Sequence, residues 1–156
     1  LAKPGEVPDS GVEEFSYSDY MLRYIVLALC SGLVDRVFWW RLVARGYGLV
    51  DKNDDGELRE RPAFLALQHF LLTLGDSTFV QACLPEQRDQ RHGLYQFEFE
   101  RPDGEHLLLC WSHGPAIAAP ALEAARIEDA LGNSLVAIPK ELSGSPLYFR
   151  DVTGLS

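Results

Sequence analysis

The hydrophobic pattern of this sequence changes period once, close to Gly75. Before that point apolar residues recur at helical spacing, and after it they alternate with polar residues. A period of 3.6 is typical of helices and a period of two is typical of strands. The sequence therefore predicts an α+β fold, with a helical region over residues 1–75 and a β-rich region over residues 76–156.

The first region has the pattern helix, strand, helix. Apolar residues from Tyr17 to Cys30 have helical spacing and fill more than one side, the hydroxyls of residues 16–18 offer N-caps, and Gly32 follows as a helix end. The β-branched and aromatic run Val34–Trp40 predicts a strand, and Pro62–Leu74 predicts a second helix. A lone strand cannot satisfy its own backbone groups, so this pattern is typical of an incomplete set of β/α repeats.

The second region contains a predicted β-hairpin. Tyr95–Phe99 alternates apolar and polar residues, Arg101–Gly104 has the composition of a tight turn, and His106–Trp111 returns as an apolar strand. Short strands separated by turns favour a small antiparallel β-sandwich. Further strands are predicted at Thr78–Leu84, Ile117–Ala119, Ala124–Ile127, Leu135–Ile138 and Leu147–Phe149.

Charge and hydropathy exclude two classes of partner. The 156 residues carry a net charge of −9, and no basic face is available for nucleic acid. No apolar run reaches the roughly 18 residues of a membrane span. A start at Leu1, without a visible basic and apolar leader, is typical of a processed chain or of a fragment of something larger.

The three cysteines give little information about compartment. An odd number leans away from a secreted, disulfide-bonded domain and, with no visible signal peptide, toward the cytoplasm. A bridge between Cys83 and Cys110 is left open. Cys110 and His113, with His92 and His106 nearby, have the residue types of a zinc site, but no second pair at short spacing is present.

The segment Asp51–Gly56 matches the first half of an EF-hand calcium loop. Position twelve of such a loop is a bidentate Glu, and here it is Pro62. We therefore favour an acidic surface turn, and no metal or cofactor is predicted.

Several segments together resemble the end of a (β/α)8-barrel glycoside hydrolase of the clan that retains configuration through two glutamates. In the first region these are Val37–Leu42, Arg45–Leu49 and Leu58–Leu67. In the second region, Asp129–Asn133 and Ser145–Tyr148 resemble the β-sandwich that follows such barrels. The resemblance implies that the first region holds the last β/α units of the barrel and the second an accessory domain.

The same resemblance implies a function. The parent protein would hydrolyse glycosidic bonds of a poly- or oligosaccharide, and both catalytic glutamates would lie upstream of Leu1. This chain alone would then be inactive, and its standing as an enzyme is left open. Glu13 and Glu14 are adjacent at a helix start, so they point to different sides and favour the helix dipole. No catalytic residue is predicted in the chain.

Four residues are predicted to bind substrate: Trp39, Trp40, Arg41 and Tyr47. The resemblance makes Trp39 the sugar-stacking platform, while strand alternation places Trp40 against a helix. Arg41 and Tyr47 would lie at the rim of the site. The alternative is that both tryptophans are packing residues, as large aromatic side chains usually are.

A second hypothesis comes from another class of protein. The chain would be a non-catalytic module that binds carbohydrate or another protein. The motivating feature is the helix Tyr17–Cys30, which is apolar on several sides. Its partner would be the rest of a barrel or a second copy of the chain.

Overall fold

The computed structural model describes residues 12–52, 54–85, 93–120 and 122–153. It has two helices and a mostly antiparallel set of strands, so the predicted α+β class is confirmed. The chain divides into two compact units, Leu1–Gln68 and His69–Ser156. The division lies within the second helix, whereas the sequence pattern placed it after Gly75.

Helix α1 spans Glu14–Cys30 and confirms the first predicted helix. Its N-cap is Glu13, whose Oε2 accepts the Ser16 backbone N–H at 3.1 Å, and not a hydroxyl of residues 16–18. Gly32, at φ +70°, follows the end of the helix, as predicted. Only one stripe of α1 is buried, so the expected burial on several sides is not seen. The buried residues are Ser18, Met21, Leu22, Ile25 and Val26.

The predicted strand Val34–Trp40 is wrong. This segment has no strand structure and most of its side chains are exposed. β-branched and aromatic residues favour extended backbone, but a ladder also needs a neighbouring strand, and none among the described residues pairs with this segment. The chain is next held at Arg41 and Leu42, whose carbonyls accept backbone N–H groups of Leu49 and Val50 at 3.1 and 2.8 Å.

A short hairpin follows that the sequence pattern did not predict. Strands β1 (Val50–Lys52) and β2 (Leu58–Glu60) pair antiparallel, with Asp51 opposite Arg59. The turn between them is the acidic segment. Helix α2 then spans Pro62–Leu74, the predicted range. Pro62 is tolerated at the first helical position because its missing N–H has no partner there.

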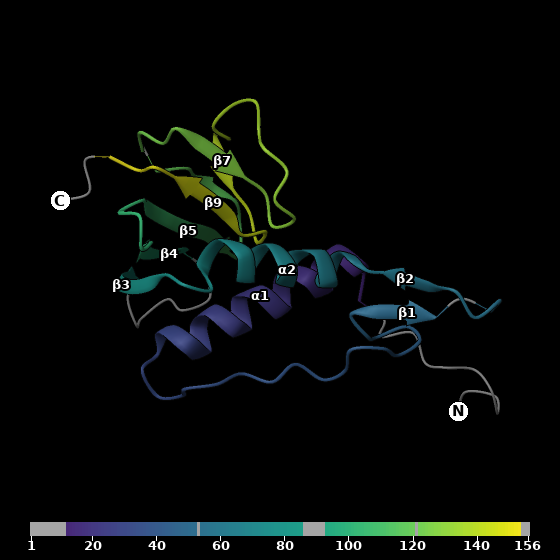
Figure 1. Cartoon of the computed structure of the whole chain (residues 1–156). Coiled ribbons are helices and arrows are strands. Elements are labelled where there is room, and N and C mark those ends of the chain that lie inside the picture. Colours follow the sequence, from purple (N-terminus) through teal and green to yellow (C-terminus); the bar gives the residue numbers. More distant parts are fainter. Residues whose placement is uncertain (1–11, 53, 86–92, 121, 154–156) are drawn as a thin grey trace. The chain divides into compact units, whose positions relative to one another are not determined.

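The second unit is built on a five-stranded antiparallel sheet of order β3-β4-β5-β9-β7 (Figure 1). The predicted hairpin is confirmed: Phe97 on β4 lies opposite Leu109 on β5, and Gly104 has φ +84° in the turn between them. The strands are β3 (Thr78–Cys83), β4 (Gly93–Glu100), β5 (His106–His113), β7 (Arg126–Glu128) and β9 (Leu147–Arg150).

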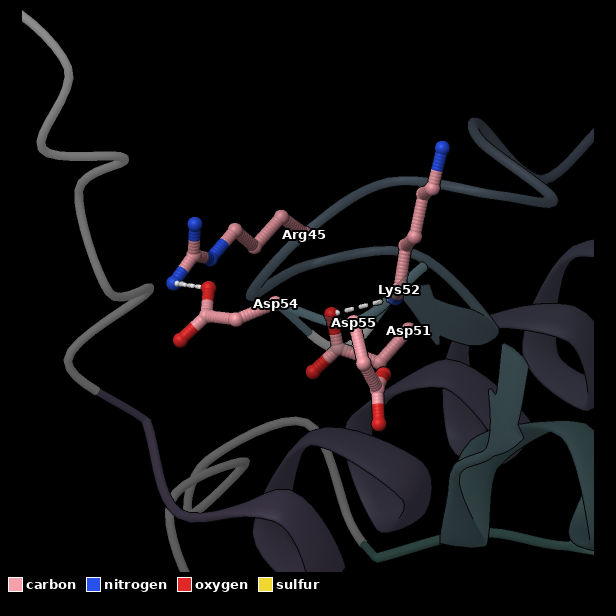
Figure 2. Close-up of a pocket in the computed structure, with 5 residues that line it drawn as sticks. All are labelled: Arg45, Asp51, Lys52, Asp54 and Asp55. Atoms are coloured by element: carbon pink, nitrogen blue, oxygen red, sulfur yellow. Dashed lines mark hydrogen bonds and ion pairs between the residues drawn. The ribbon is translucent and has the colours of Figure 1, made fainter. Parts of the chain in front are cut away.

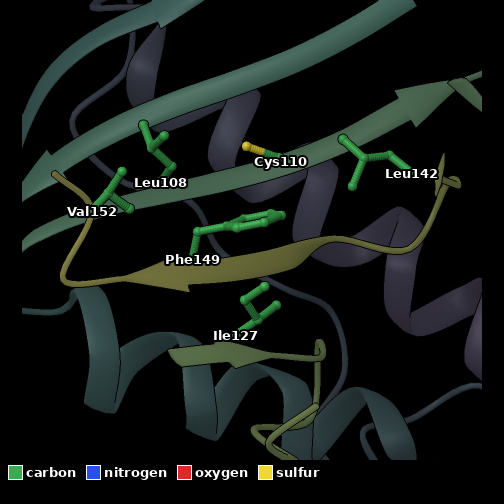
Figure 3. Packing of buried hydrophobic residues seen from close by; sticks show 6 residues of the cluster. All are labelled: Leu108, Cys110, Ile127, Leu142, Phe149 and Val152. Atoms are coloured by element: carbon green, nitrogen blue, oxygen red, sulfur yellow. The ribbon is translucent and has the colours of Figure 1, made fainter. Parts of the chain in front are cut away.

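A second, two-stranded sheet packs on one face of the first. It consists of β6 (Ile117–Ala118) and β8 (Glu141–Leu142), and the side chains between the two layers form a buried apolar cluster (Figure 3). This arrangement is sandwich-like, as predicted. The cluster consists of Leu108, Cys110, Ile127, Leu142, Phe149 and Val152.

One predicted strand of this unit does not form. Leu135–Ile138 is an exposed loop, fixed to β7 by the Leu135 backbone N–H, which donates to the Ile127 carbonyl at 2.8 Å. Apolar content alone favoured a strand here, but the backbone of this segment joins no ladder. The short strand β8, which follows it, was not predicted.

Two segments that resemble the hydrolase sandwich, Asp129–Asn133 and Ser145–Tyr148, both contact His69 of α2. Asp129 closes the loop 129–133 by accepting the backbone N–H groups of Leu131 and Asn133, each at 2.9 Å. Gly132 of this loop, at φ +87°, lies directly against the His69 ring, and the Tyr148 ring contacts the same imidazole edge-on at 4.7 Å between centroids. The conformation of this loop therefore depends on one helical side chain.

Charged groups surround His69. Its Nε2 lies 3.3 Å from a carboxylate oxygen of Glu128, and Arg150 forms two 2.6 Å hydrogen bonds with Glu105 beside them. Burial lowers the pKa of His69 despite the nearby Glu128 carboxylate. The Arg150 guanidinium lowers the pKa of Glu105. These ion pairs join the β4–β5 turn, β7, β9 and the end of α2 within the second unit.

Candidate functional site

The four predicted binding residues lie in the first unit, along the segment that follows α1. Trp39 is half-buried and packs on α1. Its indole Nε1 donates to the Tyr17 hydroxyl at 3.0 Å, and its ring lies 5.8 and 6.0 Å from the rings of Tyr17 and Tyr24. Trp39 is thus held by one hydrogen bond and two aromatic contacts.

Trp40, in contrast, is 78% exposed. The sequence placed Trp40 against a helix and made Trp39 the stacking platform, whereas in this structure Trp39 packs on α1 and Trp40 is exposed. Alternation along an extended backbone predicts two sides but not which one meets α1. Phe38 and Leu42, two residues before and after Trp40, are also exposed.

Arg41 lies beside the exposed indole. Its guanidinium carbon is 5.8 Å from the centroid of the Trp40 ring, within the range of a cation–π contact. The peptide bond between the two residues is cis. Together they present a flat aromatic face with a cation and five N–H donors next to it.

Tyr47 takes part in the site mainly through its backbone. The Tyr17 hydroxyl donates to the Tyr47 carbonyl at 2.9 Å while accepting from Trp39, so one hydroxyl connects α1, the Trp39 indole and the loop 45–48. The Tyr47 side chain is half-buried. Among the described residues, the structure shows no contact between the Tyr47 side chain and Trp40.

Two arginines and Glu14 anchor this loop to α1. Arg59 binds both carboxylate oxygens of Glu14, at 2.6 and 3.1 Å, and Arg61 Nε donates to the same carboxylate at 3.0 Å. Arg61 is only 3% exposed, and its other nitrogen donates to the Gly48 carbonyl at 3.1 Å. Hydrogen bonding to Arg59 lowers the pKa of Glu14.

The acidic turn forms an open depression of about 560 Å³ lined by charged side chains (Figure 2). Its carboxylates are engaged with protein groups: Asp54 pairs with Arg45 at 2.6 Å, and Asp55 accepts the Glu57 backbone N–H at 3.1 Å. Asp51 accepts the backbone N–H groups of Gly46 and Lys52. Burial opposes the effect of these bonds, yet the net result is a lowered pKa for Asp51.

The carboxylates of the candidate calcium loop are therefore bound to other groups of the protein, and Asn53 lies outside the described residues. Across the described part of the chain, no three metal-ligating side chains of His, Cys, Asp or Glu converge. Cys110 and His113, three apart on β5, point to opposite faces of the sheet, so they cannot hold one zinc ion. His92 lies outside the described residues.

The open question of a Cys83–Cys110 bridge is resolved. Both thiols are free. Gln96 on β4 lies between them, opposite Cys83 on one side and Cys110 on the other. The two cysteines are therefore two strand spacings apart, about 10 Å, which exceeds the roughly 7 Å that a disulfide can span between Cα atoms.

No protein-family model matches this sequence, and a search of curated proteins gives no match either. Within the described residues, neither helix combines the length and the hydropathy needed to cross a membrane.

Proposed function

We propose that this chain is the C-terminal part of a glycoside-hydrolase-like protein and that its first unit contributes a sugar-stacking surface formed by Trp40 and Arg41. The observation that carries the proposal is the exposed indole of Trp40 with the Arg41 guanidinium beside it. The resemblance to a barrel hydrolase supplies the class of ligand. The first segment of that resemblance contains both residues.

The chemistry of the surface suits a sugar ring. A pyranose has an apolar face of C–H groups that stacks on an indole, and equatorial hydroxyls that accept hydrogen bonds from a guanidinium. Trp39 supports this surface because its own indole is fixed on α1. Fixing the neighbouring residue reduces the entropy lost when Trp40 is ordered by a ligand.

Hydrolysis is assigned to the parent protein and not to this chain. A retaining glycosidase needs two carboxylates about 5–5.5 Å apart, one acting as acid and base and the other as nucleophile. Glu14 is held between Arg59 and Arg61, and Glu13 caps α1. Neither carboxylate is available for that chemistry.

The direct test is a titration of the chain with soluble neutral oligosaccharides, followed by tryptophan fluorescence. Binding should change the emission, and Trp40→Ala should abolish the change. Leu42→Ala is the matched control, because Leu42 is a neighbouring exposed apolar residue and its loss is expected to leave binding unchanged. A Trp40→Ala variant that binds as tightly as the unchanged chain would refute the proposal.

Turnover provides a second check. The chain alone should not cleave aryl glycosides. Robust turnover that survives removal of contaminating activity would show that the catalytic carboxylates lie within this sequence.

One observation favours the alternative, an interaction module. Tyr20 and Tyr24, one turn apart on the same face of α1, are each more than half exposed. If this face is an interface, the chain should self-associate in gel filtration. Tyr20→Ser should reduce the association, and Leu72→Ser on α2 should not. A monomer that responds to no oligosaccharide would contradict both functions.

A further inference from the structure

A β-bulge in the edge strand β3 changes which side chains share a face of the sheet. Phe79 lies opposite Phe99, but the next paired residue is Gln81, opposite Glu98, so Val80 is an additional residue in β3. Phe79 therefore lies on the aromatic face, 5.8 Å from the Phe99 ring. Without the bulge, Gln81 would share that face.

Because of the bulge, four polar side chains line a hollow at the end of the other face. Gln81 and Cys83 join Glu98 and Gln96 there, and with Ala82 they surround about 210 Å³. Bulges are over-represented next to binding and active sites because they re-aim side chains in this way.

The hollow has a rigid, buried carboxylate. Glu98 is 6% exposed, its Oε2 accepts the Gln81 side-chain amide at 2.8 Å, and its Oε1 lies 3.2 Å from Nδ1 of His106. A neighbouring β5 imidazole and a β3 amide thus fix the carboxylate from both sides. Each of its oxygens keeps further lone pairs for another donor.

Gln96 supplies the complementary groups. Its side-chain amide has no hydrogen-bond partner among the described residues, although the residue is half-buried between two strands. A half-buried amide without a partner leaves two donors and one acceptor unsatisfied apart from water.

We propose that this hollow binds an uncharged, hydroxyl-bearing molecule of the size of one sugar ring. A hydroxyl both donates and accepts, so neighbouring hydroxyls can bond Gln96 and Glu98 together. Among the described residues that line the hollow, Glu98 carries a negative charge that is already hydrogen-bonded and none is cationic, which disfavours an anion there. Its volume lies below the roughly 300–1,000 Å³ of drug-sized pockets.

This site is separate from the surface at Trp40, because all of its residues belong to the second unit. The proposal therefore does not depend on the function of the first unit.

Cys83 provides a reporter within the hollow. Its thiol is exposed, whereas Cys110 is buried and Cys30 is half-buried. We would measure alkylation of each cysteine by iodoacetamide with peptide mass spectrometry, using glucose, galactose and mannose in turn as probes. A sugar in the hollow shields Cys83, and occupancy of about nine-tenths slows its alkylation about tenfold. The rate at Cys30 should not change.

Three variants decide the outcome. Gln96→Leu should abolish protection of Cys83, and Gln81→Leu should weaken it; the second keeps the test valid if the first fails to fold. Trp40→Ala should leave protection intact, which separates this site from the first one. If no sugar protects Cys83, or if protection persists in folded Gln96→Leu, the inference is wrong even where oligosaccharides still bind at Trp40.

Discussion

Replacing Gly132 with alanine tests the contact between the loop 129–133 and α2. Gly132 has φ +87°, a backbone conformation that L-residues adopt at a cost of about 1–2 kcal/mol. A Cβ at this position would lie 2.7 Å from Nδ1 of His69. The imidazole cannot move away freely because the Tyr148 ring packs against it in a T-shaped contact, at 4.7 Å between ring centroids.

The expected loss is the sum of these two effects. Overpacking a fixed side chain costs about 1–3 kcal/mol, so Gly132→Ala should lower the free energy of unfolding by about 2–4 kcal/mol. For a domain of this size, each kcal/mol corresponds to about 4–8 °C in Tm.

Gly104→Ala is the matched control. Gly104 has φ +84° in the β4–β5 turn, but a Cβ there has no atom within 4 Å. Gly104→Ala should therefore cost only the backbone part, about 1–2 kcal/mol. Urea unfolding followed by circular dichroism measures both variants.

A double variant isolates the steric part. In a His69→Ala background the clash is absent, so adding Gly132→Ala should cost no more than Gly104→Ala does. Equal losses for Gly132→Ala and Gly104→Ala in the unchanged chain would refute the reasoning, because they would show that His69 does not restrict this loop.

Three further predictions concern charged groups and thiols. Glu14→Gln should destabilise the first unit by about 1–3 kcal/mol because it leaves the buried Arg61 uncompensated, whereas Glu57→Gln on the exposed turn should change it by less than about 0.5 kcal/mol; urea unfolding compares them. The folded-state pKa of His69 lies below its unfolded value of about 6.5, so the unfolded chain takes up the proton first and stability should fall as the pH drops below about 6.5. Unfolding curves measured against pH should show a smaller decline in His69→Gln. The further loss of stability below about pH 4.3, which comes from the lowered pKa of Glu105, should persist in both proteins. Burial raises the pKa of the Cys110 thiol to about 12, so in the folded chain at pH 8 Cys83 should be alkylated and Cys110 should not; equal rates at the two residues would contradict the buried position of Cys110.

Local pattern predicted the elements whose partners are close in sequence. Both helices follow from spacing and end signals, and α2 begins at Pro62 as expected. The β4–β5 hairpin follows from alternation around one tight turn. In each case the hydrogen bonds that complete the element lie within it or across a few residues.

Prediction failed where an element depends on a distant partner. Val34–Trp40 and Leu135–Ile138 have strand composition, but neither joins a ladder among the described residues. The β1–β2 hairpin is an exception, because its strands pair locally across the acidic turn. It was missed because the Asp, Lys, Arg and Glu residues of these strands gave no strand signal.

The candidate sites show the same limit. Composition identified Trp39 and Trp40 as candidates. Which of the two packs on α1 depends on the hydrogen bond of Trp39 with the Tyr17 hydroxyl, twenty-two residues away in sequence. The polar hollow was not predicted, because only the register of β3 with β4 identifies Val80 as the additional residue.

The position of the unit boundary within α2 has a practical consequence for dividing the gene. A cut after Gly75 would separate His69 from Gly132, Tyr148 and Glu128, the groups that surround it in the second unit. An expression plasmid for that unit should therefore start ahead of Pro62, so that the recombinant domain keeps the whole helix and the imidazole on which its loop rests.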